Sequence, residues 1–338
     1  MLRPSHQRFA IEGDSFASTH GRFEMKFALV FPGQGSQSLG MMSAYGDSAV
    51  VRATFDEASS AIGRDLWTLV ADGPAEALNQ TVNTQPLMLT AGVAVFRLWQ
   101  EMGGASPTVV AGHSLGEYAA LVAAGVVKLS DAVPLVELRA TAMQEAVPAG
   151  EGAMAAVLGL DAEAVKLACA EVMTATAGQV VEAVNFNDPK QTVIAGSKAA
   201  VERAAELVKA RGAKRALMLP VSAPFHCSLM QPAALRLKRR LVDVPMTTPR
   251  IPIVNNVDVA MLEDVDAIRD ALVRQAASPV RWVETMLVMQ RAGITHVLEC
   301  GPGKVLAGLA KRCSDELTGV PMHDLAALEA ALALTGHS

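Results

Sequence analysis

The sequence predicts an α/β protein with two lobes, a large one built on a parallel sheet and a smaller one inserted into it. Three observations support this prediction. The chain has 338 residues, more than an average domain, and 51% of them are hydrophobic, which suits a large core. Short apolar runs alternate with glycine turns and helical patterns, as in parallel sheets. From residue 151 the order becomes strand, helix, strand, strand, helix, strand.

The first part of the large lobe contains two predicted buried strands, each ending in a glycine turn. Phe27–Phe31 is an apolar run closed by Pro32 and a Gly-Gln-Gly-Ser-Gln turn. Thr108–Ala111 is a second buried run, and it leads into a Gly-x-Ser-x-Gly turn and a segment rich in helix formers. Helical patterns cover residues 48–62, 85–102 and 117–124.

The inserted segment has the β-α-β-β-α-β order of a ferredoxin-like module. Its predicted elements are the strand 153–159, the helix 162–173, the strands 180–185 and 192–195, the helix 199–211 and the strand 215–219. We place the small lobe at residues 151–215, with the last strand leading back to the large lobe, which comprises residues 25–150 and 216–338. Two further strands of the large lobe are expected at 251–255 and 295–299.

Composition and charge exclude several classes of protein. The net charge is −5, so the chain has no general attraction for nucleic acids or anionic membranes. Its four cysteines form no Cys-x-x-Cys pair, which argues against a zinc site or disulfide framework and favours a reducing compartment. No apolar stretch reaches the roughly 18 residues of a membrane span. We expect a soluble, cytoplasmic protein with no metal, nucleic acid or membrane partner.

Residues 1–24 mix basic and acidic residues and contain no apolar core of the kind that a signal peptide requires. We interpret them as a disordered leader. Met25 directly precedes the first predicted strand and is a candidate for the natural start, in which case the upstream residues are a vector-derived or mis-assigned extension.

Gly112-His113-Ser114-Leu115-Gly116 is the first candidate catalytic motif. Between a strand and a helix, this pattern exposes the serine hydroxyl on a strained turn, and glycines stand where side chains would clash. The helix N-terminus adds N–H donors for an oxyanion. The alternative is a glycine-rich turn whose serine only caps the helix. The flanking strand and helix favour a nucleophile at Ser114.

A serine nucleophile needs a base, and sorting the seven histidines by position favours His226. Four of them lie in the leader or the C-terminal tail. His113 neighbours the nucleophile, where adjacent side chains diverge, so we expect it to pack or donate locally. His296 lies within a strand pattern, and we interpret it as a core residue. His226 follows a rigid loop, although taken alone a loop histidine is most often an ordinary surface residue.

Two other glycine turns have a weak likeness to nucleotide-binding motifs. The turn Gly33–Gln37 lacks the third glycine of a dinucleotide fingerprint, and no acidic residue ends a following strand. Its backbone is instead a candidate for the second oxyanion donor. The turn Gly301–Lys304 lacks the glycine spacing and the following Ser or Thr of a P-loop, and we interpret it as a strand-to-helix turn.

Arg139 lies within the apolar stripe of its predicted helix. Apolar residues precede and follow it at intervals of three and four residues. A buried guanidinium needs an anionic partner. One interpretation is an ion pair with a core carboxylate, or an arginine that extends to solvent. The other is a bidentate contact with a substrate carboxylate.

Taken together, these motifs closely resemble the malonyl-CoA:acyl carrier protein transacylases of bacterial fatty-acid synthesis and the related acyltransferase domains of polyketide synthases. The resemblance extends from about Met25 to Cys313. One departure is Ser278, where many members carry Asn. The motifs that carry the resemblance are Phe31–Gln37, Gly112–Glu117, Arg139, Phe225-His226, and Gln275 before Pro279-Val280-x-Trp282.

The resemblance implies a hydrolase-like large lobe with a parallel sheet, the ferredoxin-like small lobe and a cleft between them. It also implies that Ser114 is the nucleophile and that His226 is its base. The main-chain carbonyl of Gln275 would orient His226 in place of the acid of a three-residue triad. The N–H groups of Gln34 and Leu115 would form the oxyanion hole.

The same resemblance assigns a substrate site. Arg139 would bind the malonyl carboxylate, and we group Gln275 and Phe225 with it. In polyketide relatives a bulky Phe before the histidine accompanies a preference for malonyl over methylmalonyl, and Phe225 fits that pattern.

The implied reaction is ping-pong: the malonyl group of malonyl-CoA passes to Ser114 and then to the phosphopantetheine thiol of acyl carrier protein. No cofactor is implied, because the coenzyme A thioester is a substrate. The carrier is acidic in this family, so Lys238-Arg239-Arg240 is a candidate docking surface, with a solvated helix face as the alternative. We expect a monomer, because no heptad or interface stripe is evident.

Two rival functions follow from the same residues. A serine hydrolase would need an acidic triad member between the serine and the histidine, and it would not need Arg139. A catalytically silent acyl-binding or scaffold protein would not need Ser114 and His226, and the presence of both argues against it.

Overall fold

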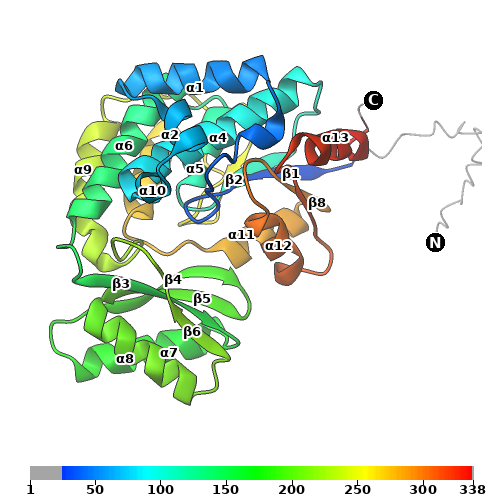
Figure 1. Cartoon of the computed structure of the whole chain (residues 1–338). Helices are drawn as coiled ribbons and strands as arrows, with labels where there is room; N and C mark the ends of the chain where they lie inside the picture. Colours follow the sequence, from blue (N-terminus) through cyan, green and yellow to red (C-terminus); the bar gives the residue numbers. More distant parts are fainter. Residues whose placement is uncertain (1–24, 337–338) are drawn as a thin grey trace, which may run out of the picture.

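The structure, a computed structural model, describes residues 25–336 (Figure 1). The predicted leader, residues 1–24, lies outside the described residues. The described chain forms a large lobe with a parallel sheet and a small lobe with an antiparallel sheet. The α/β fold class predicted from the sequence is therefore confirmed.

The sheet of the large lobe has five strands in the order β7-β2-β1-β8-β9, with parallel neighbours. The strands are β1 (Phe27–Phe31), β2 (Val109–Gly112), β7 (Ile253–Val254), β8 (His296–Glu299) and β9 (Thr318–Pro321). Every residue of β1 and β2 is buried, as continuous apolar runs in the middle of a parallel sheet should be. The sequence did not predict β9, an edge strand whose glycine and proline are unfavourable in strands.

Helices cover both faces of this sheet. The helices of the large lobe are α1 (Ala49–Ile62), α2 (Leu66–Asp72), α3 (Ala75–Leu78), α4 (Thr81–Glu101), α5 (Gly116–Ala123), α6 (Leu129–Glu145), α9 (Gln231–Leu241), α10 (Val265–Gln275), α11 (Trp282–Arg291), α12 (Val305–Cys313) and α13 (Leu325–Leu334), with the short 3₁₀ helices η1 (Ser43–Tyr45) and η2 (Ser228–Met230). No helix within residues 25–336 combines the length and the apolar composition of a membrane span.

Side chains alternate along β1 and pack into two cores. Leu29 and Phe31 join the core under α1, α4, α5 and α6, whereas Ala28 and Val30 join the core under α11 and α12. The helix predicted over residues 85–102 begins earlier, at Thr81. Its first turn buries polar residues, so no apolar periodicity marked its start.

The small lobe is a four-stranded antiparallel sheet with two helices packed on one face (Figure 1). Its elements are β3 (Gly152–Leu158), α7 (Ala162–Ala175), β4 (Val181–Asp188), β5 (Gln191–Ser197), α8 (Lys198–Ala210) and β6 (Arg215–Met218). The strand order β4-β5-β3-β6 is that of the predicted ferredoxin-like module. Since β6 pairs with β3 up to Met218, we propose that the small lobe ends after Met218 rather than at residue 215.

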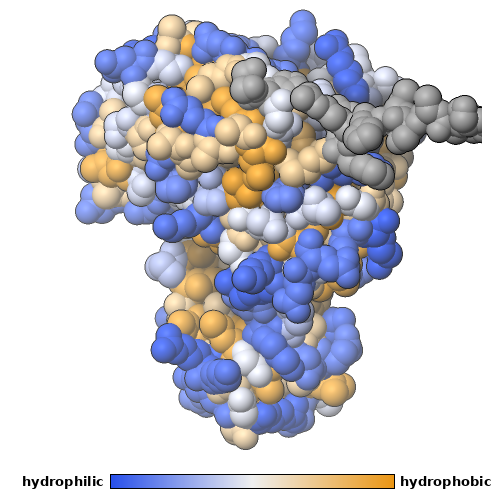
Figure 2. Space-filling model, turned by 90° about the vertical axis from the view of Figure 1, so that its right-hand side faces the viewer, coloured by the Kyte–Doolittle hydropathy of each residue, from blue (hydrophilic) through white to orange (hydrophobic). Residues whose placement is uncertain are grey.

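The second face of the small sheet is turned toward the large lobe. Met154 and Val193 of this face share an apolar cluster with Met143 of α6 and with Phe225. At the sheet edge, Val280 donates its N–H to the oxygen of Val184 at 2.8 Å, which joins the loop before α11 to β4. Figure 2 shows the small lobe as a narrower projection beneath the large lobe, with a mostly hydrophilic surface on this side. The two lobes are thus packed together beside the carboxyl ends of β1 and β2.

Candidate active site

Ser114 lies in the sharp turn between β2 and α5. Its φ of 53° is in the left-handed region, which a non-glycine residue adopts only under strain. A Cβ on Gly112 would lie 1.9 Å from the carbonyl carbon of Gly116, and a Cβ on Gly116 would lie 2.0 Å from the carbonyl oxygen of Phe31. Both positions therefore require glycine, and the turn has the tight geometry that the pentapeptide predicts.

His226 faces the serine hydroxyl. Ser114 Oγ lies 2.6 Å from His226 Nε2, and His226 Nδ1 lies 2.9 Å from the main-chain oxygen of Gln275. A carbonyl oxygen can only accept, so Nδ1 carries the proton and Nε2 is free to accept the hydroxyl proton of Ser114. The partner of Nδ1 is thus a carbonyl, whereas the rival serine hydrolase would place a carboxylate there.

Burial keeps His226 neutral. The residue is 3% exposed, and desolvation together with the charge of Arg139 lowers the pKa of His226 to about 3. A neutral imidazole at pH 7 is the state that a general base requires.

His113 packs and donates locally, as predicted: its Nε2 donates to Asn187 Oδ1 at 2.8 Å, and its ring lies 5.4 Å from the Trp282 ring.

Arg139 is buried in the middle of α6, with 1% of its surface exposed. Its Nη1 donates to Gln85 Oε1 at 2.7 Å, and its Nη2 donates to Gln275 Oε1 at 2.9 Å and to Ser114 Oγ at 3.2 Å. Its guanidinium also lies 5.4 Å from the centre of the Tyr118 ring. The polar partners of Arg139 within residues 25–336 are amide and hydroxyl oxygens rather than a carboxylate. A cation that faces Ser114 Oγ without a direct counter-ion is suited to an anionic group bound in the pocket.

The turn Gly112–Gly116, called the elbow below, contains the main-chain amide of Leu115, and the amide of Gln34 follows a residue that packs against this turn. Gly33 packs so closely that a Cβ there would be 2.6 Å from the carbonyl oxygen of His113 and 3.8 Å from the nitrogen of Leu115. Within residues 25–336, neither the Gln34 nor the Leu115 amide donates to a protein acceptor. Gln34 instead uses its side chain, which donates to Thr81 Oγ1 at 3.3 Å. Because their N–H groups have no protein acceptor within residues 25–336, these two amides can donate to the oxygen atom of a bound ligand.

Beneath the elbow lies a buried polar group whose role sequence reasoning missed. Asn256 Oδ1 accepts from the Ser114 N–H at 2.7 Å, and Asn256 Nδ2 donates to the Gly112 oxygen at 2.7 Å. Glu117 Oε2 accepts from the Asn256 N–H at 3.1 Å and from Gln275 Nε2 at 2.9 Å. The only sequence signal was the position of Glu117, three residues after the nucleophile and in the first turn of α5.

A pocket opens over Ser114 between the two lobes. Its apolar wall includes Met143, Met154 and Phe225, and Asn185 adds an amide from the small lobe. Phe225 is 8% exposed and packs into the cluster at the lobe junction, directly before His226. The predicted site residues Ser114, Leu115, Gln34, Arg139, Phe225 and His226 all line this pocket. Gln275 lies behind it, in contact with His226 and Arg139.

Comparison with known proteins agrees with this geometry. Residues 28–327 match the family described as "Acyl transferase domain". The chain belongs to the acyl transferase family. It is 55% identical over 310 residues to the malonyl CoA-acyl carrier protein transacylase of Escherichia coli K12, covering 91% of this chain and 99% of the relative. The resemblance to the transacylases, predicted from the motifs, is thereby confirmed.

Solved acyl transferase structures have the same fold. The acyl-carrier-protein S-malonyltransferase of Burkholderia pseudomallei 1710b is 60% identical with a TM-score of 0.89, covering 91% of this chain and 100% of that one. A malonyl-transacylase solved in complex with a type II polyketide synthase acyl-carrier protein is 53% identical, with a TM-score of 0.89 and coverage of 91% and 99%.

One prediction outside the site of this acyl transferase, that His296 is a core residue, was wrong. His296 is not a core residue: it begins β8, is partly exposed, and its Nδ1 lies 2.9 Å from Thr295 Oγ1. The strand pattern did not reveal that this residue is the first of the strand rather than an interior one.

Lys238, Arg239 and Arg240 lie in the last turn of α9, where their positive charges interact favourably with the helix dipole. This position fits both a docking surface and a solvated helix face.

Proposed function

We propose that this chain transfers a malonyl group from malonyl-CoA to the phosphopantetheine thiol of acyl carrier protein, through an ester on Ser114. One observation carries the assignment of residues. Ser114 Oγ is contacted both by His226 Nε2 at 2.6 Å and by Arg139 Nη2 at 3.2 Å. A base activates the hydroxyl, and a cation beside it attracts an acyl group that carries a carboxylate. The names of the relatives support the same donor group and acceptor.

In the first half-reaction, His226 takes the hydroxyl proton as Ser114 Oγ attacks the thioester carbonyl. The carbonyl oxygen becomes an oxyanion and accepts from the amides of Gln34 and Leu115. When the tetrahedral intermediate collapses, the C–S bond breaks and coenzyme A leaves with the proton that His226 held. The product is malonyl-Ser114 with a neutral histidine.

The second half-reaction reverses these roles with a new thiol. His226 takes the proton of the phosphopantetheine thiol, and the thiolate attacks the ester carbonyl. The intermediate collapses with cleavage of the C–Oγ bond, and His226 returns the proton to Ser114. In both halves the Gln275 carbonyl holds the Nδ1–H tautomer, a role that an acid has in a three-residue triad.

Arg139 selects the acyl group in this proposal. A hydrogen-bonded pair with a charged group contributes about 1.5 to 3 kcal/mol, so it can favour malonyl over acetyl by roughly tenfold to a hundredfold. Phe225 closes the pocket beside the base and disfavours a branched acyl group. The reaction needs no cofactor, since both thiols and the acyl group come from the substrates.

The proposal places this activity in fatty-acid or polyketide chain elongation, with the enzyme as a cytoplasmic monomer. All four cysteines are buried free thiols, which supports a reducing compartment. Acyl carrier protein is the proposed macromolecular partner, and a malonyl-transacylase relative has been solved with its carrier.

The test is the mass of the intact protein after mixing with malonyl-CoA and then with holo acyl carrier protein. We expect a single malonyl adduct that disappears when the carrier is added, with the malonyl group recovered on the carrier. Ser114→Ala should show no adduct. An adduct lost to water without transfer would indicate a hydrolase, and an adduct that persists in Ser114→Ala would move the nucleophile elsewhere.

A further inference from the structure

Gln275 connects four parts of the site. Its main-chain oxygen binds His226 Nδ1, and its side-chain Oε1 accepts from Arg139 Nη2 at 2.9 Å. Its Nε2 donates to the Ser114 carbonyl oxygen and to Glu117 Oε2, both at 2.9 Å. The residue is fully buried as the last residue of α10. The orientation of one amide therefore determines which atom faces the guanidinium.

Glu117 selects that orientation. If the amide were turned by 180°, its NH₂ group would face the Arg139 donor, and its oxygen would face the oxygens of Ser114 and Glu117. A carboxylate is the stronger of the two acceptors on the Nε2 side. The carboxylate of Glu117 and the guanidinium of Arg139 thus lie at opposite ends of one amide, and each favours the observed arrangement.

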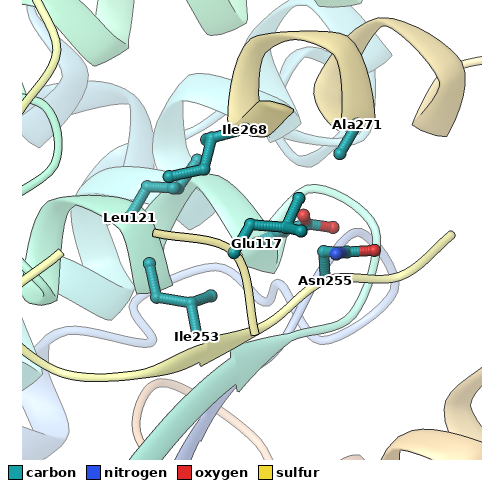
Figure 3. A pocket seen from close by; sticks show the side chains of 7 residues that line it. Glu117, Leu121, Ile253, Asn255, Ile268 and Ala271 are labelled. Atoms are coloured by element: carbon teal, nitrogen blue, oxygen red, sulfur yellow. The ribbon is translucent and has the colours of Figure 1, made fainter. Parts of the chain in front are cut away.

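The surroundings of Glu117 offer it few other partners. The carboxylate lines a cavity whose wall is mostly aliphatic, with Leu121, Ile253 and Ile268 around it and Asn255 beside it (Figure 3). It is 3% exposed, and this burial raises the pKa of Glu117 to about 7, against the lowering effect of Gln275 and Asn256. A carboxylate in an apolar cavity is costly unless it is hydrogen-bonded, and the hydrogen bonds it receives come from the residues that hold the elbow and the arginine.

We propose that Glu117 is a positioning residue for acyl-group selection: through the side-chain amide of Gln275 it holds the Arg139 guanidinium toward Ser114 Oγ, where the carboxylate of the acyl group binds. This inference rests on the proposed function, since it needs Arg139 to be the partner of that carboxylate. Glu117 touches neither the acyl group nor the reacting atoms. Its effect passes through Gln275 and should change selectivity more than the rate of acyl transfer.

Glu117→Leu removes the acceptor and keeps most of the volume. We expect the ratio of kcat/KM for malonyl-CoA to that for acetyl-CoA to fall by about threefold to tenfold, the range that one hydrogen bond accounts for. Most of this change should be a higher KM for malonyl-CoA. Glu117→Gln retains an acceptor oxygen and should keep most of the ratio. A loss of folded protein would lower both rates equally and leave the ratio unchanged.

Glu299→Gln is the matched control. Glu299 is also a buried carboxylate whose pKa burial raises to about 7, but its Oε2 accepts from the Ala307 N–H at 2.8 Å, in α12. This substitution should leave the malonyl-to-acetyl ratio unchanged. If Glu117→Leu does not fold, Gln275→Leu removes the side chain through which Glu117 would act, while the main-chain oxygen that holds His226 remains. The ratio should then fall by at least the amount predicted for Glu117→Leu.

Arg139→Ala separates the two proposals. If this variant keeps the malonyl-to-acetyl ratio of the wild type, the proposed role of Arg139 fails. If it loses the ratio but either Glu117→Leu or Gln275→Leu keeps it, the role of Arg139 stands and the inference about Glu117 is overturned. We expect Glu117→Leu to have no further effect on the ratio in the Arg139→Ala background, since the residue that it positions is then absent.

Discussion

Two strand-to-helix turns at the same edge of the large sheet have different surroundings. The turn after β2 carries Ser114, and its backbone is held by the side chains of Asn256 and Gln275 from distant parts of the chain. The turn after β8, at Gly301–Lys304, is followed by α12, and Glu299 beside it accepts from an amide of that helix. Each has a buried carboxylate with a pKa near 7. The comparison indicates that the first turn becomes a site because side chains from other elements hold it, in addition to its own strained shape.

The largest effect should come from removing His226, the proposed base that faces Ser114 in the first turn. In His226→Gln, we expect the rate of malonyl-enzyme formation to fall by about 10⁴-fold or more, because the hydroxyl of Ser114 loses its proton acceptor. Rapid-quench measurement of the acyl-enzyme checks this. Glu299→Gln, at the second turn, should change the rate by less than about twofold. A His226→Gln variant with near-normal acylation would show that another group is the base.

Glycine substitutions should distinguish the two turns next. Gly112→Ala places a Cβ 1.9 Å from backbone atoms of Gly116, so the elbow cannot keep its shape, and we expect acylation to be lost together with about 3 kcal/mol or more of stability. Gly303 has a φ of 87°, and a Cβ there would lie 3.2 Å from the Ser36 side chain. We therefore expect Gly303→Ala to lower the stability of the protein by about 1 to 2 kcal/mol.

Denaturant unfolding and acylation of the folded protein measure these two effects separately. We expect Gly303→Ala to retain acylation when it is folded. If both alanine variants acylate normally, the shape of the first turn is not what exposes Ser114.

The pH dependence of acylation should report on Arg139. Desolvation is the main cause of the low pKa of His226, and the positive charge of Arg139 is the next. Arg139→Leu removes that charge, so the pKa of His226 should rise toward its ordinary value. Because the base must be neutral, the acid limb of kcat/KM for acetyl-CoA should then move to higher pH. Acetyl-CoA is the right substrate, since it has no carboxylate for Arg139 to bind. An unmoved limb would mean that this charge does not act on His226.

The smallest effect concerns stability at the second turn. Burial raises the folded-state pKa of Glu299 from 4.5 to about 7, so the folded protein binds more protons than the unfolded chain between these values. The stability that protonated Glu299 contributes is complete below pH 4.5 and is lost as the pH rises to 7. Glu299→Gln should remove this dependence and gain stability relative to the wild type at pH 8, on the order of 1 kcal/mol. Urea unfolding of the wild type and Glu299→Gln at pH 5 and pH 8 tests the sign of this stability difference.

Local patterns were enough to predict much of the fold. The apolar run of β1, the glycines around Ser114 and the β-α-β-β-α-β order each reflect constraints that act over a few residues. The prediction was poorer where a strand is at an edge, as in β9, or where a helix begins with buried polar residues, as in α4. Those elements are stabilised by contacts with distant segments, which no local periodicity records.

The sequence by itself determined the motifs, the two-lobed α/β class and the candidates Ser114, His226 and Arg139, because residue type and spacing limit which chemistry each can support. Only the tertiary structure decided how these residues are connected. Residues 114, 139, 226 and 275 come from four separate segments, and the distances between their atoms depend on how α5, α6, α10 and the loop before η2 pack. The same packing brings Glu117 and Asn256 into contact under the elbow. These two residues are separated by 139 positions in the chain, and no sequence pattern predicts their contact.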